Sequence, residues 1–135
     1  MPKNLGEKTK LVAGIAPISR SAGTANGTVI DRLGFLDAVV LLKVGAATGS
    51  PSAQGVAMKI QHGDAADGSD MADVTGAVID ALTADNAEAQ LDIDLSGYKR
   101  YIRAVVITTF TGGTSPAIPS AVTIALGNSD IEPVS

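Results

Sequence analysis

The chain lacks cysteine and is poor in aromatic and histidine side chains. Its 135 residues include no Cys, no Trp, two Tyr, two Phe and one His. Without cysteine, disulfide bonds and thiolate chemistry are excluded. With so few aromatic rings, the chain offers no platform on which bases or sugars would stack. The single histidine, His62, has no serine in a nucleophile-elbow context beside it, so no catalytic triad is predicted and we expect no enzyme activity.

Long apolar runs and an excess of positive charge are also missing. No run approaches the roughly 20 apolar residues that a membrane-spanning helix requires. The first residues, MPKNLGEKTK, are basic but have no apolar stretch before a small-residue cleavage site, so we expect synthesis without export. The formal net charge of -4 argues against general nucleic-acid binding. We therefore expect neither nucleic acid nor a membrane as a partner.

The residues that are abundant are aliphatic. Hydrophobic residues make up 45% of the chain, and Gly occurs 15 times. One domain of this size buries roughly two-thirds of its unfolded surface, which is enough for a core. No segment combines sustained helical periodicity with capping signals. About six to eight short segments of strand character, separated by Gly, Pro, Ser and Asp turns, predict an all-β fold, namely an antiparallel β-sandwich, jelly-roll-like, with extended terminal arms.

Three segments carry the clearest strand signals. Residues 35–44 have an unbroken apolar face from Leu36 to Val44, and the opposite face is also apolar in its middle, which predicts a central or doubly covered strand. Residues 87–95 alternate strictly, whereas residues 101–110 are apolar on both faces. Because Ser96-Gly97 predicts a turn between them, these two segments are predicted to pair as a hairpin. Shorter strands are predicted at 28–33, 56–62, 77–82 and 121–126.

The chain ends are less clearly patterned. Residues 11–19 are apolar and extended in character, but Pro17 lacks an N–H and restricts this segment to an edge strand or a packed arm. The predicted organisation is an N-terminal arm and loop over 1–27, a sandwich domain over 28–127 and a C-terminal tail over 128–135. The first ten residues are either a floppy tail or an arm that becomes ordered on a partner.

Charge is distributed unevenly along the chain. Nine acids and no Lys or Arg lie between Ile60 and Tyr98, whereas the first twenty residues hold four bases and one acid. One interpretation is a solvated acidic face beside a mobile tail. The other is that the basic arm of one subunit meets the acidic face of another, an arrangement that sets specificity. The sequence leaves both open.

Two charged clusters are candidate sites. Aspartates recur at every third position of one loop (Asp64, Asp67, Asp70 and Asp73), but the spacing is not that of a calcium loop. Aspartate also forms solvated Asx turns, so we predict no metal and no cofactor. Lys99, Arg100 and Arg103 form a basic cluster without a Gly-rich phosphate loop or a helix N-terminus. Such residues are predicted to pair with carboxylates such as Asp92 or Asp94, or to face a partner.

Several longer motifs resemble a known group of proteins. They are IDRLGFLDAVVLLKVGA (30–46), KIQHGDAADGSDMADVTG (59–76), LDIDLSGYKRYIRAVV (91–106) and AVTIALG (121–127). Together they resemble small virion proteins that tailed bacteriophages and prophages encode beside their major capsid genes, over about residues 28–127. The resemblance implies a capsid decoration, or cement, protein with a jelly-roll-like sandwich. It also implies a position on the capsid exterior after assembly in the host cytoplasm, where the protein bridges neighbouring major capsid subunits.

The resemblance implies contacts with the phage major capsid protein and self-association on the capsid as a dimer or trimer. Candidate contact residues are the apolar and basic side chains of the N-terminal segment and the basic cluster: Lys8, Lys10, Leu11, Val12, Ile15, Ile18, Lys99, Arg100 and Arg103. The nearest alternative role is a tail, neck or head-completion protein, which differs in copy number. A carbohydrate-binding sandwich is disfavoured by the missing aromatics, and a small hydrolase by the missing nucleophile and base.

Overall fold

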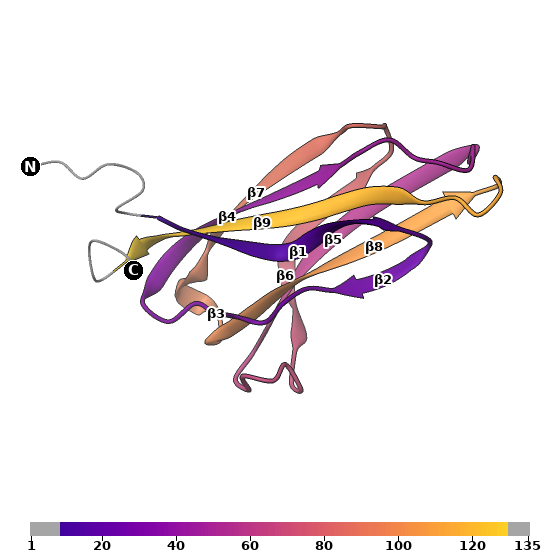
Figure 1. Cartoon of the computed structure of the whole chain (residues 1–135). Helices are drawn as coiled ribbons and strands as arrows, with labels where there is room; N and C mark the ends of the chain where they lie inside the picture. Colours follow the sequence, from indigo (N-terminus) through magenta and orange to yellow (C-terminus); the bar gives the residue numbers. More distant parts are fainter. Residues whose placement is uncertain (1–8, 130–135) are drawn as a thin grey trace, which may run out of the picture.

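The structure, a computed structural model, describes residues 9–129, and most of these residues are in β-strands (Figure 1). The elements in order are β1 (Lys10–Arg20), β2 (Gly23–Asn26), β3 (Ile30–Asp31), β4 (Phe35–Val44), β5 (Ala53–Gly63), β6 (Ala72–Leu82), β7 (Glu88–Asp94), the short 3-10 helix η1 (Leu95–Gly97), β8 (Tyr101–Thr111) and β9 (Ile118–Ser129). Among these residues, no helix is long and apolar enough to cross a membrane.

The strands form two antiparallel sheets that pack face to face. The first sheet has the order β1-β9-β4-β7, and the second has the order β2-β8-β5-β6 with β3 also paired to β8. Strands that are distant in sequence lie side by side in both sheets, as expected where connections cross from one sheet to the other. The predicted all-β, jelly-roll-like antiparallel sandwich is confirmed.

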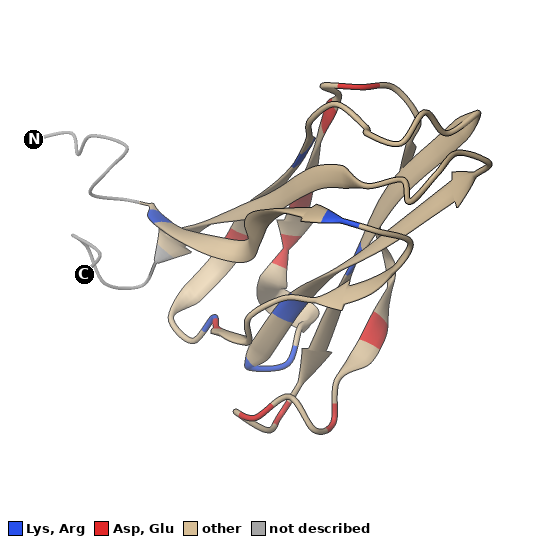
Figure 2. Cartoon of the chain, turned by 45° about the vertical axis from the view of Figure 1, so that its right-hand side comes forward, with Lys and Arg blue, Asp and Glu red and all other residues tan. Residues whose placement is uncertain are grey.

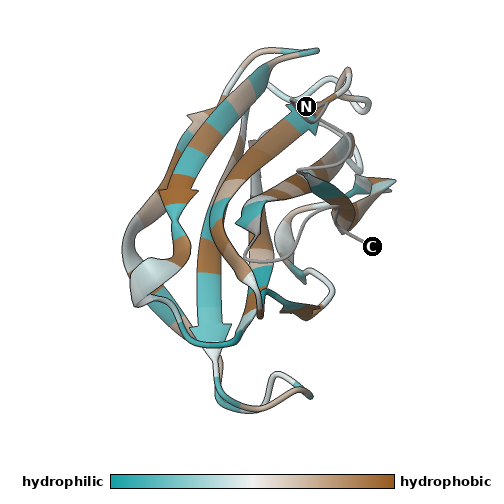
Figure 3. Cartoon of the chain, turned by 90° about the vertical axis from the view of Figure 1, so that its left-hand side faces the viewer, coloured by the Kyte–Doolittle hydropathy of each residue, from teal (hydrophilic) through white to brown (hydrophobic). Residues whose placement is uncertain are grey.

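The core lies between the sheets and is filled by alternate aliphatic residues. In β4, Val40 and Leu42 are fully buried, whereas the neighbouring Val39 lies on the opposite face of the strand and is 39% exposed. Figure 3 shows the resulting alternation of hydrophobic and hydrophilic bands along the strands. β4 lies between β9 and β7, so its predicted central position is confirmed. The predicted buried face is wrong at its first residue, because Phe35 is buried and Leu36 is 45% exposed.

The predicted hairpin between residues 87–95 and 101–110 is wrong. Both segments are strands, but β7 pairs with β4 in the first sheet and β8 pairs with β5 in the second. Between them, η1 carries the chain from one sheet to the other: Leu95 is fully buried, and the Asp94 side chain accepts a hydrogen bond from the Ser96 N–H at 3.0 Å. An alternating pattern specifies which face of a strand is buried but not which strand lies beside it, so a buried corner was mistaken for a tight turn.

The N-terminal segment that the structure describes lies within the sheets. β1 is an edge strand that pairs with β9 and has register irregularities on both sides of Ile15. Pro17 is therefore tolerated, because an edge strand leaves alternate N–H groups unpaired. Ile15 is only 5% exposed and packs in the core. The predicted domain boundaries, including a functional arm, stay predictions, and residues 1–8 and 130–135 lie outside the described part of the chain.

The junction after β2 closes one side of the sandwich. The Gly27 N–H donates to the Ala104 carbonyl at 2.7 Å, and the Thr28 N–H donates to the Gly14 carbonyl at 3.0 Å, so this junction bridges β8 and β1. A Cβ at Gly27 would collide with the Gly14 carbonyl, so only glycine fits there.

Candidate functional site

The basic cluster lies at the end of the sandwich where β3, β5 and the start of β8 meet. Arg100 forms a two-pronged contact with Asp31 on β3, with Nη2 at 2.8 Å from Oδ2 and Nε at 3.1 Å from Oδ1. Its guanidinium also lies 5.1 Å from the centre of the Tyr101 ring. A bidentate arginine–carboxylate pair fixes the orientation of both groups. The predicted pairing with Asp92 or Asp94 is wrong, because those residues lie on β7 in the other sheet.

Lys99 contributes both its side chain and its backbone to this end. Its Nζ lies 3.4 Å from Oδ2 of Asp64, and both side chains are at least half exposed. Its backbone N–H donates to Nδ1 of His62 at 3.1 Å. The His62 ring meets the Tyr98 ring edge-on, with 5.6 Å between ring centres. These contacts give His62 a role in holding the 98–99 backbone, in agreement with a polar residue at a strand end.

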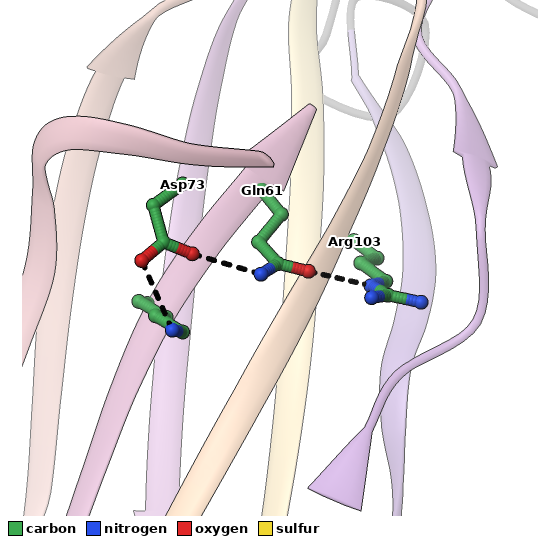
Figure 4. A network of polar contacts seen from close by, with 4 residues as sticks. Gln61, Asp73 and Arg103 are labelled. Atoms are coloured by element: carbon green, nitrogen blue, oxygen red, sulfur yellow. Dashed lines mark hydrogen bonds and ion pairs between the residues drawn. The ribbon is translucent and has the colours of Figure 1, made fainter. Parts of the chain in front are cut away.

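Arg103 belongs to a polar network that crosses three strands of the second sheet (Figure 4). Its Nε donates to Oε1 of Gln61 at 2.8 Å, and Nε2 of Gln61 donates to Oδ1 of Asp73, also at 2.8 Å. Lys59 closes the network with Nζ at 3.0 Å from Oδ2 of Asp73. Within residues 9–129, Arg103 therefore contacts an amide and makes no ion pair. Gln61 thereby orients the Arg103 side chain, and no carboxylate in the described part of the chain is paired with it.

Arg32 holds this end together, although the sequence patterns do not predict it. Its guanidinium donates to the carbonyls of Lys99 at 3.1 Å, Phe35 at 3.3 Å and Tyr98. One side chain thus fastens the turn after β3 to the segment before β8. In the sequence, Arg32 is one residue of the turn-forming IDRLGF motif. That motif does not indicate which distant carbonyl groups the arginine contacts.

The aspartates of the β5–β6 loop mainly shape the loop. The Asp70 carboxylate accepts hydrogen bonds from the backbone N–H groups of Asp64 at 2.9 Å and Ala65 at 3.1 Å, and Asp67 accepts one from the Ser69 N–H at 2.9 Å. The Asp67 contact is an Asx turn, whereas the Asp70 contacts tie the end of the loop back to its start. Across the described residues, no group of three or more His, Asp or Glu side chains is arranged to hold a metal ion. The loop is also shorter than predicted, since β6 begins at Ala72.

Hydrogen bonds lower the pKa of several carboxyls at this end. The Arg100 guanidinium holds the pKa of Asp31 below its ordinary value of 3.8. Gln61 and then Lys59 lower the pKa of Asp73, because both donate to its charged form. Burial raises the pKa of the Tyr98 phenol, to which the nearby Asp94 charge adds. The carboxylates are therefore ionised at neutral pH and keep the end polar (Figure 2).

The predicted contact residues of the N-terminal segment fall into distinct environments. Leu11 and Ile18 are 70% and 54% exposed on β1, whereas Ile15 is buried and Val12 is half-buried. Lys10 and Val12 help to line a cavity of about 350 Å³ together with Ile30, Asp31 and Leu126. The start of β1 is thereby brought close to the Arg100–Asp31 pair. Lys8, the remaining predicted contact residue, lies outside the described residues.

Comparisons with known proteins are informative about the fold. No known family description matches the chain, and no curated protein sequence matches it. Among solved structures, the chain is similar to VP2 of infectious bursal disease virus in its subviral particle, with a TM-score of 0.51 and 14% identity. That match covers 90% of this chain and 33% of VP2, so the chain spans about a third of the viral protein. The likeness to VP2 shows a shared fold.

Two further similar structures are more distant. The SPBc2 prophage-derived protein YomS has 12% identity and a TM-score of 0.42, and the match covers 87% of this chain and 91% of YomS. The coat protein of Tobacco streak virus has 13% identity and a TM-score of 0.38, with 95% of this chain and 92% of the coat protein covered.

Proposed function

We propose that this protein is a structural component of a virion that decorates the capsid exterior and bridges neighbouring major capsid subunits. The observation that carries the proposal is the sandwich fold shared with a viral capsid protein, VP2. The motif resemblance to small phage virion proteins supports the same role. Assembly would take place in the host cytoplasm, where the major capsid protein is the partner.

The edge strand β1 is the surface we assign to the capsid contact. It lies at the edge of the first sheet and exposes Leu11 and Ile18. An edge strand offers unpaired backbone groups to which a partner can add a strand, and neighbouring apolar side chains give specificity. The nearby basic residues Lys10, Lys99, Arg100 and Arg103 would guide acidic capsid surfaces to this end, since complementary charge acts mainly on association and specificity.

The copy number on particles tests this role. The protein is co-produced with the major capsid protein of the same virus, and the particles are purified and reconstructed by electron cryomicroscopy. Decoration predicts density repeated over the whole outer shell. Density confined to one vertex would instead support a tail, neck or head-completion protein. Particles without the protein would overturn both roles.

A matched pair of substitutions tests the β1 surface. Ile18→Asp places a charge on a 54% exposed position of β1, and Val78→Asp does the same at a 49% exposed position of β6 in the other sheet. Both should fold, because exposed substitutions usually change stability by less than about 0.5 kcal/mol. We expect Ile18→Asp to lose at least tenfold in occupancy in particle co-sedimentation, while Val78→Asp retains it. Equal occupancy for both variants would contradict the assignment of β1.

A further inference from the structure

We infer that the outer face of the first sheet is a docking site for residues 1–8 of a second copy of this chain, so that two copies exchange their N-terminal segments. The contact is between copies in solution and is tested without capsids, although it shares the exposed Leu11 of β1 with the proposed capsid surface.

The outer face carries an apolar stripe that the core does not use. The β-sheet register aligns Leu11 of β1, Ala125 of β9 and Val39 of β4 in one row across three adjacent strands. Leu11 is 70% exposed and Val39 is 39% exposed. The next row on the same face aligns Ala13, Thr123 and Leu41. Contiguous exposed apolar side chains bordered by polar residues are typical of interaction surfaces.

An acidic rim borders this stripe along β7. Asp37 of β4 lies directly opposite Asp94 of β7, and Asp92 continues the row that contains Val39. Like charges directly opposite each other destabilise a sheet. On the same face, Glu88 forms an ion pair with Lys43, with 3.6 Å between the charged atoms. Within residues 9–129, Asp37, Asp92 and Asp94 form no ion pair. The rim therefore suits a partner that brings positive charge together with apolar side chains.

Residues 1–8 have this composition. The segment MPKNLGEK holds Lys3 and Lys8 against Glu7, and it also carries the apolar Met1 and Leu5. Eight extended residues reach about 26 Å, and three strand spacings from β1 to β7 amount to about 14 Å. The segment is therefore long enough to cross the face from the apolar stripe to the acidic rim.

The register favours a second copy as the source of the segment. β1 begins at Lys10, which pairs with Leu126, and the next row beyond it contains Gly127, Asp37 and Asp94. A segment returning over its own Leu11–Val39 row would have to reverse direction within one or two residues of Lys10. A second copy has no such constraint. In a twofold pair each copy gives one segment and receives one, which doubles the contact area.

A charge exchange tests the inference on the full chain. One variant carries Lys3→Glu and Lys8→Glu, and the other carries Asp37→Lys and Asp92→Lys. In sedimentation equilibrium, the unmodified chain should form dimers that dissociate with added salt, and each variant alone should sediment as a monomer. An equimolar mixture of the two should regain the dimer mass, because each segment then meets a face of opposite charge.

Controls separate this contact from a general effect of charge or misfolding. Asp80→Lys, on the exposed side of β6 in the second sheet, should leave the dimer unchanged. All variants should keep the unmodified thermal midpoint within a few degrees. Because the chain has no native cysteine, mixing a Leu5→Cys variant with a Val39→Cys variant provides a second measurement. A disulfide between the two chains supports exchange. A monomeric unmodified chain, or a mixture that stays monomeric, overturns it.

Discussion

Val39 and Val40 are adjacent in β4 but lie on opposite faces of the first sheet. Val40 is fully buried in the core, whereas Val39 is 39% exposed. We expect Val40→Ala to lower the free energy of unfolding by about 2 kcal/mol, through the lost methyl groups and the cavity left behind. Val39→Ala should change it by less than about 0.5 kcal/mol. Urea unfolding of both variants checks this, and equal effects would contradict the assigned faces.

A substitution of Arg103 tests whether its side chain contacts the capsid. Its Nε is held by Gln61, and it makes no ion pair among the described residues, so Arg103→Gln should change the thermal midpoint little. If Arg103 faces an acidic capsid surface, the substitution should lower particle occupancy about threefold to tenfold. This loss should be smaller at high salt, because salt screens the interaction between charges. Lys43→Gln, on the first sheet beside Glu88, removes the same charge and should retain occupancy. A loss of stability without a loss of binding would assign Arg103 to internal packing.

At the scale of elements, the decisive feature is the passage of the chain through η1 from β7 to β8. The register places Leu41 opposite Gln90, so a Leu41→Cys/Gln90→Cys variant should form a disulfide under mild oxidation. A β7–β8 hairpin would instead bring Gln90 near Val106, which lies in the other sheet. A Gln90→Cys/Val106→Cys variant should therefore stay reduced. Mass spectrometry after oxidation distinguishes the two arrangements.

Edge strand β1 limits which truncations are informative. Deleting residues 1–8 removes a basic segment and leaves every described strand in place. Deleting through residue 18 also removes Ile15, which is 5% exposed in the core, together with most of the pairing with β9. The short deletion is therefore the one that separates a role of the N-terminal segment in docking from a loss of the fold.

At the scale of the whole molecule, acid should destabilise the fold. Within residues 9–129, six carboxyls have a pKa held below the ordinary 3.8, in each case because a hydrogen-bond donor stabilises the charged form: Asp31, Asp67, Asp70, Asp73, Asp85 and Asp94. A depressed folded-state pKa stabilises the protein above the unfolded value, and this stabilisation is lost as the pH falls through the folded values. Urea midpoints should be level from pH 7 to 5 and decline below pH 4.

The Asp31→Asn variant serves as the control for this pH dependence. It removes one of the six groups, so its stability at neutral pH should be lower by up to about 1 kcal/mol, as is usual for exposed ion pairs. Its decline below pH 4 should be correspondingly shallower. A urea midpoint that stays constant from pH 7 down to pH 2 would contradict the contribution of these hydrogen-bonded carboxylates.

The sequence by itself determined that this protein is an all-β sandwich, because alternation within one strand is a local property. The bounds of β4 and the buried face of β5 follow directly from it. Pro17 likewise restricted its segment to an edge, since a missing N–H is a property of one residue. Only the tertiary structure decided which strands pair, because residues on different strands meet through the packing of two whole sheets. That packing placed Arg100 on Asp31, Arg103 on Gln61 and β7 beside β4, leaving Asp37 opposite Asp94.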